Sequence, residues 1–267
     1  MTTPAGLSWN DAIAAVHSPG QMFELVDAEV RGVKMAVFKH APANLTQIFG
    51  LARGHGDKDF LVYEGERWSF AKTFEQVDAL ANRLVNVYGI NKGDRVAIAM
   101  RNYPEWAMAF AGIVIAGGVS VSMNSWWTED ETDYALRDSG AKVLICDDQR
   151  FENARKTCAD LGIHVLLVRS ELPSSAGHDR WETALELGVA APDVQVTADD
   201  DATILYTSGT TGRPKGAVST HRAVISALMA FSARQAIEGV RATVKPEPDP
   251  FPPSFILIVP LFHVTGC

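Results

Sequence analysis

The residues from Tyr206 to Gly216 combine the residue types that bind a polyphosphate. They read Y-T-S-G-T-T-G-R-P-K-G. The glycines allow consecutive backbone N–H groups to converge on an anion. Hydroxyl groups and one lysine can donate hydrogen bonds to phosphate oxygens. The candidate phosphate-binding residues are Thr207, Ser208, Gly209, Thr210, Thr211, Gly212 and Lys215.

Two common phosphate-binding motifs do not fit this stretch. Lys215 follows Pro214 and precedes Gly216, so the G-x-x-x-x-G-K-[ST] spacing of the P-loop is absent. No G-x-G-x-x-G follows a predicted strand, which argues against a dinucleotide site. A Gly/Ser/Thr-rich surface turn is the alternative that needs no ligand. The density of donors favours the phosphate-binding interpretation.

The elements on either side of this loop place it at the end of a sheet strand. The apolar run Ala202–Tyr206 predicts a short buried strand, and apolar periodicity predicts a helix over residues 220–238. Open α/β sheets bind ligands outside the carboxyl ends of their strands. The loop is therefore expected where such a sheet would hold a ligand.

Strands and helices alternate along the chain before the loop. A hairpin is predicted around Glu64-Gly65, and capping boxes predict helix starts at Thr73 with Gln76 and at Thr128 with Glu131. Buried strands are predicted at residues 95–100, 119–123, 143–146, 164–168 and 254–259. This alternation predicts an α/β fold with a largely parallel sheet flanked by helices.

The composition excludes several classes of function. The net charge of −8 and the absence of a Lys/Arg cluster argue against nucleic-acid binding. The uncharged run 106–123 is interrupted by glycines and is better explained by a helix that leads into a strand than by a membrane span. No signal sequence opens the chain, and Cys146, Cys158 and Cys267 lack metal-ligand spacing. Reduced cysteines and a cytoplasmic location are expected.

Two motifs resemble those of a known enzyme family. Y-T-S-G-T-T-G-R-P-K-G resembles the ATP-phosphate loop of the adenylate-forming superfamily, which includes acyl-CoA synthetases, luciferases and peptide-synthetase adenylation domains. P-L-F-H-V-T-G, from Pro260 to Gly266, resembles the next motif of that family, whose histidine borders the carboxylate and acyl pocket. The resemblance implies that His263 is the catalytic-site histidine and that Thr207 helps to hold Mg²⁺. Structural roles for both residues remain the alternative.

The resemblance also implies a reaction and its substrates. ATP, Mg²⁺ and CoA would be used to convert a carboxylic acid into acyl-AMP and then acyl-CoA. The combination of N-S-W-W-T at residues 124–128 with the arm before Asn44 looks more like a fatty-acyl-CoA synthetase than a peptide-synthetase domain. Trp126 and Trp127 themselves are interpreted as packing residues.

The resemblance covers only the N-terminal half of such an enzyme. Residues 1–43 are expected to form an N-terminal arm, and residues 44–267 an incomplete N-terminal domain that binds ATP and the acyl group. The family's downstream glutamate, ribose-binding aspartate and mobile-domain lysine have no counterpart, so these 267 residues alone are expected to form no acyl-AMP. The alternative is a noncatalytic module that binds nucleotide weakly, associates with itself or docks to the downstream half.

Overall fold

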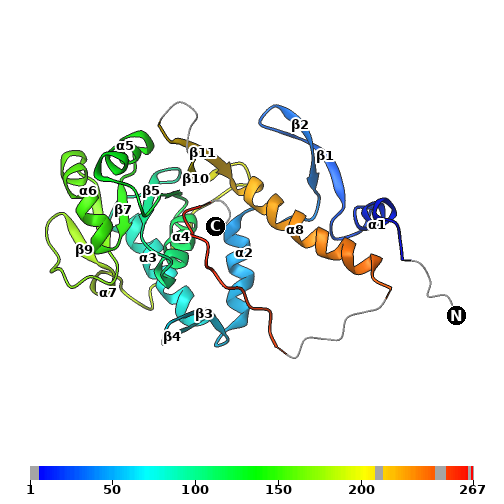
Figure 1. Ribbon diagram of the computed structural model, residues 1–267, viewed down its shortest axis with the longest axis horizontal. Coiled ribbons are helices and arrows are strands. Elements are labelled where there is room, and N and C mark those ends of the chain that lie inside the picture. Colours follow the sequence, from blue (N-terminus) through cyan, green and yellow to red (C-terminus); the bar gives the residue numbers. More distant parts are fainter. Residues whose placement is uncertain (1–5, 208–212, 244–250, 264–265, 267) are drawn as a thin grey trace. The chain divides into compact units, whose positions relative to one another are not determined.

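The chain divides into two compact units (Figure 1). The computed structural model describes residues 6–207, 213–243, 251–263 and 266. One unit comprises Met1–Leu45, Thr197–Asp199 and His221–Ile256, and the other comprises Thr46–Val196, Asp200–Thr220 and Leu257–Cys267. The arm and domain expected at 1–43 and 44–267 stay a prediction.

A seven-stranded sheet forms the centre of the second unit. Its strand order is β11-β10-β6-β5-β7-β8-β9, and every neighbouring pair is parallel except β10 with β11. The strands are β5 (Arg95–Ala99), β6 (Val119–Ser122), β7 (Val143–Cys146), β8 (His164–Leu167), β9 (His178–Arg180), β10 (Asp201–Thr207) and β11 (Lys215–Thr220). The largely parallel sheet expected from the sequence is confirmed.

Helices pack on both faces of this sheet (Figure 1). One face presents Val96 and Ile98 to helices α3 and α4, whereas the other presents Ala97 and Leu144 to helices α5 and α6. Strands buried on both faces are apolar at successive positions, which explains the uninterrupted apolar runs in the sequence. The helices of this unit are α2 (Leu45–Ala52, whose first residue belongs to the other unit), the 3₁₀ turn η1 (Arg53–His55), α3 (Phe70–Asn86), α4 (Pro104–Ile115), α5 (Glu129–Ser139), α6 (Asp148–Leu161) and α7 (Trp181–Ala184).

The uncharged run 106–123 forms most of α4 and the strand β6, as expected. In the part of the chain that the structure describes, no helix combines the length and the apolar character needed to cross a bilayer. Cys146 and Cys158 are free and buried, and burial raises the pKa of both thiols, that of Cys158 to about 12. Both are therefore protonated packing residues at neutral pH; Cys267 lies outside the described residues.

The predicted helix starts have different outcomes. Thr128 and Glu131 form the expected capping box at the start of α5. The prediction for Thr73 is wrong, because α3 begins at Phe70, where the Ser69 side chain accepts a hydrogen bond from the backbone N–H of Lys72 at 3.2 Å. The predicted hairpin is confirmed as β3 (Asp59–Tyr63) and β4 (Glu66–Ser69), and β4 runs directly into α3. This direct transition moves the cap to the last strand residue.

The strand predicted at residues 254–259 is absent. The side chains of Phe255, Ile256 and Ile258 are 78%, 87% and 82% exposed, so the expected burial is also wrong. The sequence pattern was apolar enough for a buried strand, but no ladder partner is found for it among the described residues. A strand needs such a partner, since its backbone hydrogen bonds lie between strands.

The first unit contains a hairpin that the sequence did not predict. Strands β1 (Leu25–Val30) and β2 (Val33–Phe38) form this antiparallel hairpin. Helix α1 (Trp9–Val16) packs on α8 (His221–Arg241) through Ala12, Val16, Ala233 and Ile237. This small apolar cluster is the core of the unit.

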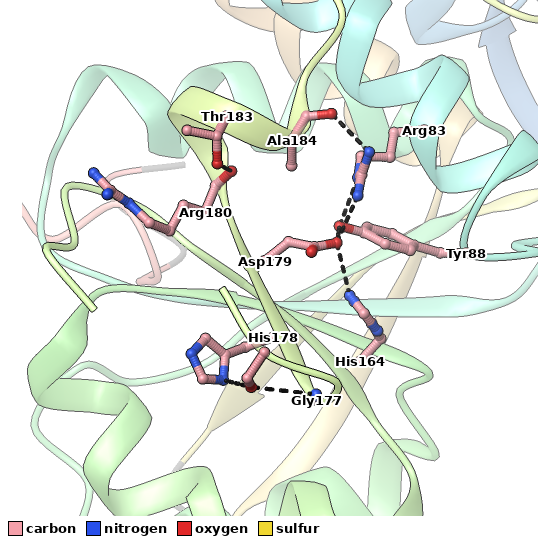
Figure 2. A network of polar contacts seen from close by, with 10 residues as sticks. Arg83, Tyr88, His164, Gly177, His178, Asp179, Arg180, Thr183 and Ala184 are labelled. Carbon is pink, nitrogen blue, oxygen red and sulfur yellow. Dashed lines mark hydrogen bonds and ion pairs between the residues drawn. The ribbon is translucent and has the colours of Figure 1, made fainter. Parts of the chain in front are cut away.

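A polar network fastens the edge strand β9 of the second unit (Figure 2). The Oδ2 atom of Asp179 accepts hydrogen bonds from Arg83 Nη2 at 2.6 Å and from the Tyr88 hydroxyl at 2.8 Å, and it lies 3.1 Å from His164 Nε2. Arg83 also donates to the Ala184 carbonyl at 2.7 Å. Although burial alone would raise the pKa of Asp179, these donors hold it below its usual range. The carboxylate thus joins α3, β8 and β9.

We predict that Asp179→Asn lowers stability at pH 7 by about 1–3 kcal/mol, because two donors lose a charged acceptor. A depressed carboxyl pKa contributes stability above the unfolded-state pKa and loses it as the pH falls through the folded-state pKa. The difference between variant and wild type should therefore shrink as the pH drops below about 4. Urea denaturation at a series of pH values measures this difference in stability.

The control Asp59→Asn, which breaks an exposed pair with Arg67, should cost less than about 1 kcal/mol. A pH-independent difference for Asp179→Asn would contradict the prediction.

Candidate active site

The carboxyl ends of the parallel strands meet at one edge of the sheet. In the ladder between β6 and β10, the last residue of β6, Ser122, pairs with Leu205, and β10 continues two residues further to Thr207. Residues 123–128 follow β6, and the predicted phosphate loop follows β10 at Thr207. Parallel strands place their carboxyl ends at one edge, which is where open α/β sheets bind ligands.

The phosphate loop joins β10 to an antiparallel neighbour that the sequence did not reveal. Thr207 pairs with Lys215 at the end of this hairpin that adjoins the loop, and the Thr207 hydroxyl donates to the Lys215 carbonyl at 3.5 Å. Both residues are exposed. Among the described residues, no carboxylate pairs with the Lys215 ammonium group. The pairing brings two of the predicted site residues together; Ser208, Gly209, Thr210, Thr211 and Gly212 lie outside the described residues.

Gly216 has a packing reason to be glycine. A Cβ atom there would lie 2.8 Å from the Ile204 side chain of the neighbouring strand β10. Contacts this short force neighbouring atoms to move. The glycine thus permits the close approach of β11 to β10 next to the loop.

Tyr206 anchors the end of β10 to α5. Its hydroxyl donates to Asp138 Oδ2 at 2.7 Å, and its ring lies edge-on to Trp127 with 5.6 Å between centroids. Burial, followed by the Asp138 carboxylate, raises the pKa of the Tyr206 hydroxyl, so it stays protonated as a donor. On the far side of the loop, the Arg213 guanidinium lies over the Tyr134 ring of the same helix at 5.1 Å. Both sides of the loop therefore contact α5.

Buried polar contacts connect the segments that follow β5, β6 and β7. The Asp147 carboxylate accepts hydrogen bonds from the backbone N–H groups of Arg101 at 3.2 Å and Arg150 at 3.1 Å. The Arg150 guanidinium lies 3.3 Å from Asp147 and donates through Nε to the Ser125 carbonyl at 2.7 Å. Asp147 and Arg150 are buried, with 6% and 8% of their surface exposed. Sequence reasoning missed both, although Asp147 directly follows a predicted strand.

Arg169, which follows β8, serves structure rather than anion binding. Its terminal nitrogens donate to the Glu66 carboxylate, both at 2.8 Å, and its Nε donates to Glu105 at 3.0 Å. The guanidinium lies 5.1 and 5.0 Å from the ring centroids of Tyr63 and Tyr103. Hydrogen bonding to Arg169 lowers the pKa of Glu66 despite partial burial. Two carboxylates already neutralise this cation.

His263 lies after a segment that contacts the same edge. Asn102, which follows β5, hydrogen-bonds the main chain at Leu257, Val259 and Leu261. Phe262 is buried and lies edge-on to the ring of Trp126, with 5.3 Å between centroids. His263 itself is exposed, and its backbone N–H donates to the Pro260 carbonyl at 3.0 Å. Trp126 is 71% exposed. Among the described residues, its ring contacts one other aromatic ring, that of Phe262, so its packing role is small.

Comparison with known proteins identifies the family. The profile of a family described as AMP-binding enzyme matches residues 50–267. The chain belongs to the AMP-binding enzyme family. Among its relatives, a crotonobetaine/carnitine–CoA ligase of Salmonella typhi is 33% identical over 189 residues. That match covers 67% of this chain but 36% of the ligase, so the chain spans little more than a third of its length.

Solved structures carry the same fold as this AMP-binding chain. A Rhodopseudomonas palustris protein described as a long-chain-fatty-acid CoA ligase superposes with a TM-score of 0.70 at 20% identity, over 85% of this chain and 53% of that one. The N-terminal subdomain of Klebsiella oxytoca NpsA superposes with a TM-score of 0.52 at 27% identity, over 68% and 43% of the two chains. The α/β architecture is therefore that of the N-terminal domain of adenylate-forming enzymes.

We predict that Tyr206→Phe destabilises the chain by about 1–2 kcal/mol, because Asp138 loses a short hydrogen bond from a half-buried residue while the ring keeps its packing. Urea denaturation at pH 7 measures the change. Tyr134→Phe is the matched control, since the Tyr134 hydroxyl reaches the same carboxylate at 3.5 Å and should contribute less than about 0.5 kcal/mol. Equal effects of the two variants would show that the anchor is not the Tyr206 hydroxyl.

Proposed function

We propose that the full-length protein carrying this chain activates a carboxylic acid. In that reaction the carboxylate attacks the α-phosphorus of ATP, which gives acyl-AMP and releases pyrophosphate. The sulfur of CoA then attacks the acyl carbon, and AMP leaves. The observation that carries the proposal is the pairing of Thr207 with Lys215 at the base of a glycine- and hydroxyl-rich loop, at the carboxyl edge of the sheet.

The residues of this site fit a role in positioning and charge neutralisation. Lys215 is exposed beside the loop and would attract the ATP phosphates as a point charge. The exposed Thr207 hydroxyl is an oxygen ligand of the kind that Mg²⁺ accepts, and Mg²⁺ would neutralise phosphate charge during nucleotidyl transfer. No nucleophile from the protein is needed, because binding the two substrates in line supplies the rate enhancement.

The remaining loop positions and His263 complete the proposed site. Backbone N–H groups of Gly209 and Gly212, with the hydroxyls of Ser208, Thr210 and Thr211, would donate to the phosphates. His263 would border the carboxylate of the acid. Phe262, which directly precedes His263 in sequence, forms an aromatic pair with Trp126, and this apolar pair supports an apolar acid.

Within carboxylic acids, we propose a fatty acid as the substrate and CoA as the acceptor. Support comes from the N-S-W-W-T combination at residues 124–128 and from relatives that act as CoA ligases. These relatives differ in their acids, since crotonobetaine/carnitine, anthranilate and benzoate all occur among them. The acid is therefore the part of the proposal that a substrate panel must decide.

A partner-docking role is the second candidate. It is favoured by the exposed apolar side chains at Phe255, Ile256 and Ile258. Exposed apolar patches of this kind mark interaction surfaces. The partner proposed is the downstream part of an adenylate-forming enzyme, since the matched relatives are much longer than this chain. In this role the chain would contribute its phosphate loop to a site completed by that partner.

The nucleotide part of the proposal predicts a loss of ATP affinity in Lys215→Ala. Equilibrium binding of Mg·ATP to this chain should weaken about tenfold, which corresponds to about 1.4 kcal/mol, because a charge-assisted contact is removed. Lys72→Ala on the exposed face of α3 is the matched control and should leave the affinity unchanged. The difference should shrink at high salt. An unchanged affinity in Lys215→Ala would refute the phosphate role, and no binding to wild type would favour docking.

The acid part predicts a different pattern for His263→Ala in the full-length protein. The KM for the acid in pyrophosphate release should rise about fivefold or more, while the KM for ATP changes less than about twofold. The reason is that His263 is proposed to border the carboxylate rather than the phosphates. His55→Ala, which removes an exposed histidine packed on Phe70, should change neither value. A change in the ATP value alone would overturn the assignment.

A further inference from the structure

The Asn102 side chain makes an unusual set of contacts with the segment before His263. Its Nδ2 donates to the carbonyls of Leu257 at 3.1 Å and Val259 at 2.8 Å. Its Oδ1 accepts from the backbone N–H of Leu261 at 2.9 Å. Both ends of the carboxamide are therefore committed to main-chain groups at alternate positions of the segment.

This alternation is the pattern that a neighbouring strand would recognise. In an extended chain, residues two apart present their backbone groups to the same side. A carboxamide carries a donor and an acceptor in one plane, as a peptide group does. Asn102 thus takes the place of a strand edge for Leu257, Val259 and Leu261.

The backbone that carries Asn102 is itself fixed. The N–H of Arg101 donates to the buried Asp147 carboxylate at 3.2 Å, and the N–H of Tyr103 donates to the Arg101 carbonyl at 2.7 Å. Helix α4 begins immediately afterwards at Pro104, which is buried. The position of the carboxamide is therefore set by the end of β5 and the start of α4.

Side-chain packing does little to hold the start of the segment. Ile258 is 82% exposed and Leu257 is 52% exposed. Packing resumes at Leu261 and Phe262, which are buried, with Phe262 against Trp126. Before His263, the Asn102 hydrogen bonds, the core packing of Leu261 and the contact of Phe262 with Trp126 hold the chain.

We propose that Asn102 is a positioning residue for the acid site: its carboxamide holds residues 257–261 and thereby sets the location of His263. The proposal rests on the function proposed above for His263. Asn102 contacts only main chain in this segment, so it acts through the histidine and not on a substrate. Its loss should impair use of the acid. Use of ATP should change little, because the proposed nucleotide contacts of Thr207 and Lys215 come from β10 and β11.

Amide hydrogen exchange in this chain tests the contact without any enzymatic activity. In Asn102→Ala the Leu261 amide loses its acceptor and should exchange at least about tenfold faster. In Asn102→Asp, which has nearly the same shape, the acceptor remains and Leu261 should stay protected, while the donor to Leu257 and Val259 is replaced by a repulsive oxygen. Asn82→Ala, which removes a side-chain bond to the Ala190 carbonyl in the same unit, should leave Leu261 unchanged.

Pyrophosphate release by the full-length protein tests the consequence. Both Asn102 variants should raise the KM for the acid about fivefold or more and leave the KM for ATP within about twofold, with Asn82→Ala like wild type. An unchanged exchange rate of the Leu261 amide in Asn102→Ala would show that the Asn102 carboxamide does not hold residues 257–261. Faster exchange at Leu261 in Asn102→Ala, together with an unchanged acid KM in that variant, would overturn the positioning role. If the wild-type protein released no pyrophosphate in response to an acid, the proposed function and the role of Asn102 in acid use would both be refuted. The exchange data would still decide whether Asn102 holds the segment.

Discussion

The parallel pairing of β5, β6, β7 and β10 is the constraint on which the candidate site depends. Parallel strands in register must end at one edge, so the segments that follow them converge whatever their separation in sequence. Ser122 and Leu205 are ladder partners although 83 positions separate them (205 minus 122). The same geometry brings Asn102, Asp147 and Thr207 to that edge. Apolar burial on both faces fixes the strands, and the strands fix the polar residues.

A buried layer of polar contacts lies between this rigid sheet and the exposed residues proposed for chemistry. Asp147 accepts main-chain bonds from the segments after β5 and β7, and Arg150 reaches the segment after β6. A buried carboxylate without partners would be costly, so each of these bonds also satisfies a charge. Thr207, Lys215 and His263 can remain exposed because the chain beneath them is held. In the proposed function, substrates would then approach groups whose backbone is held by these contacts.

The sequence predicted the features that depend on local pattern. Successive apolar residues such as Val96 and Ala97 face opposite sides of the sheet, so burial on both faces produces readable runs. The phosphate loop was predicted from its composition and from the resemblance, and it stays a prediction because residues 208–212 lie outside the described part of the chain. Strand β11 was missed because K-G-A-V-S-T has little apolar character and its pairing with β10 decides its structure. Asn102 was missed because a single polar residue after a strand carries no signal until its partners, more than 150 positions away, are known.

The segment at residues 254–259 shows why apolar content alone does not specify a strand. A strand is defined by backbone hydrogen bonds to another strand, and burial of its side chains follows from that pairing. Here the main chain of Leu257, Val259 and Leu261 bonds to one side chain rather than to a ladder, and Ile258 stays in solvent. The carboxamide satisfies three backbone groups but covers no apolar surface. Residues 254–259 therefore have a defined path without the burial that their composition favours, and burial begins only at Leu261 and Phe262, directly before His263.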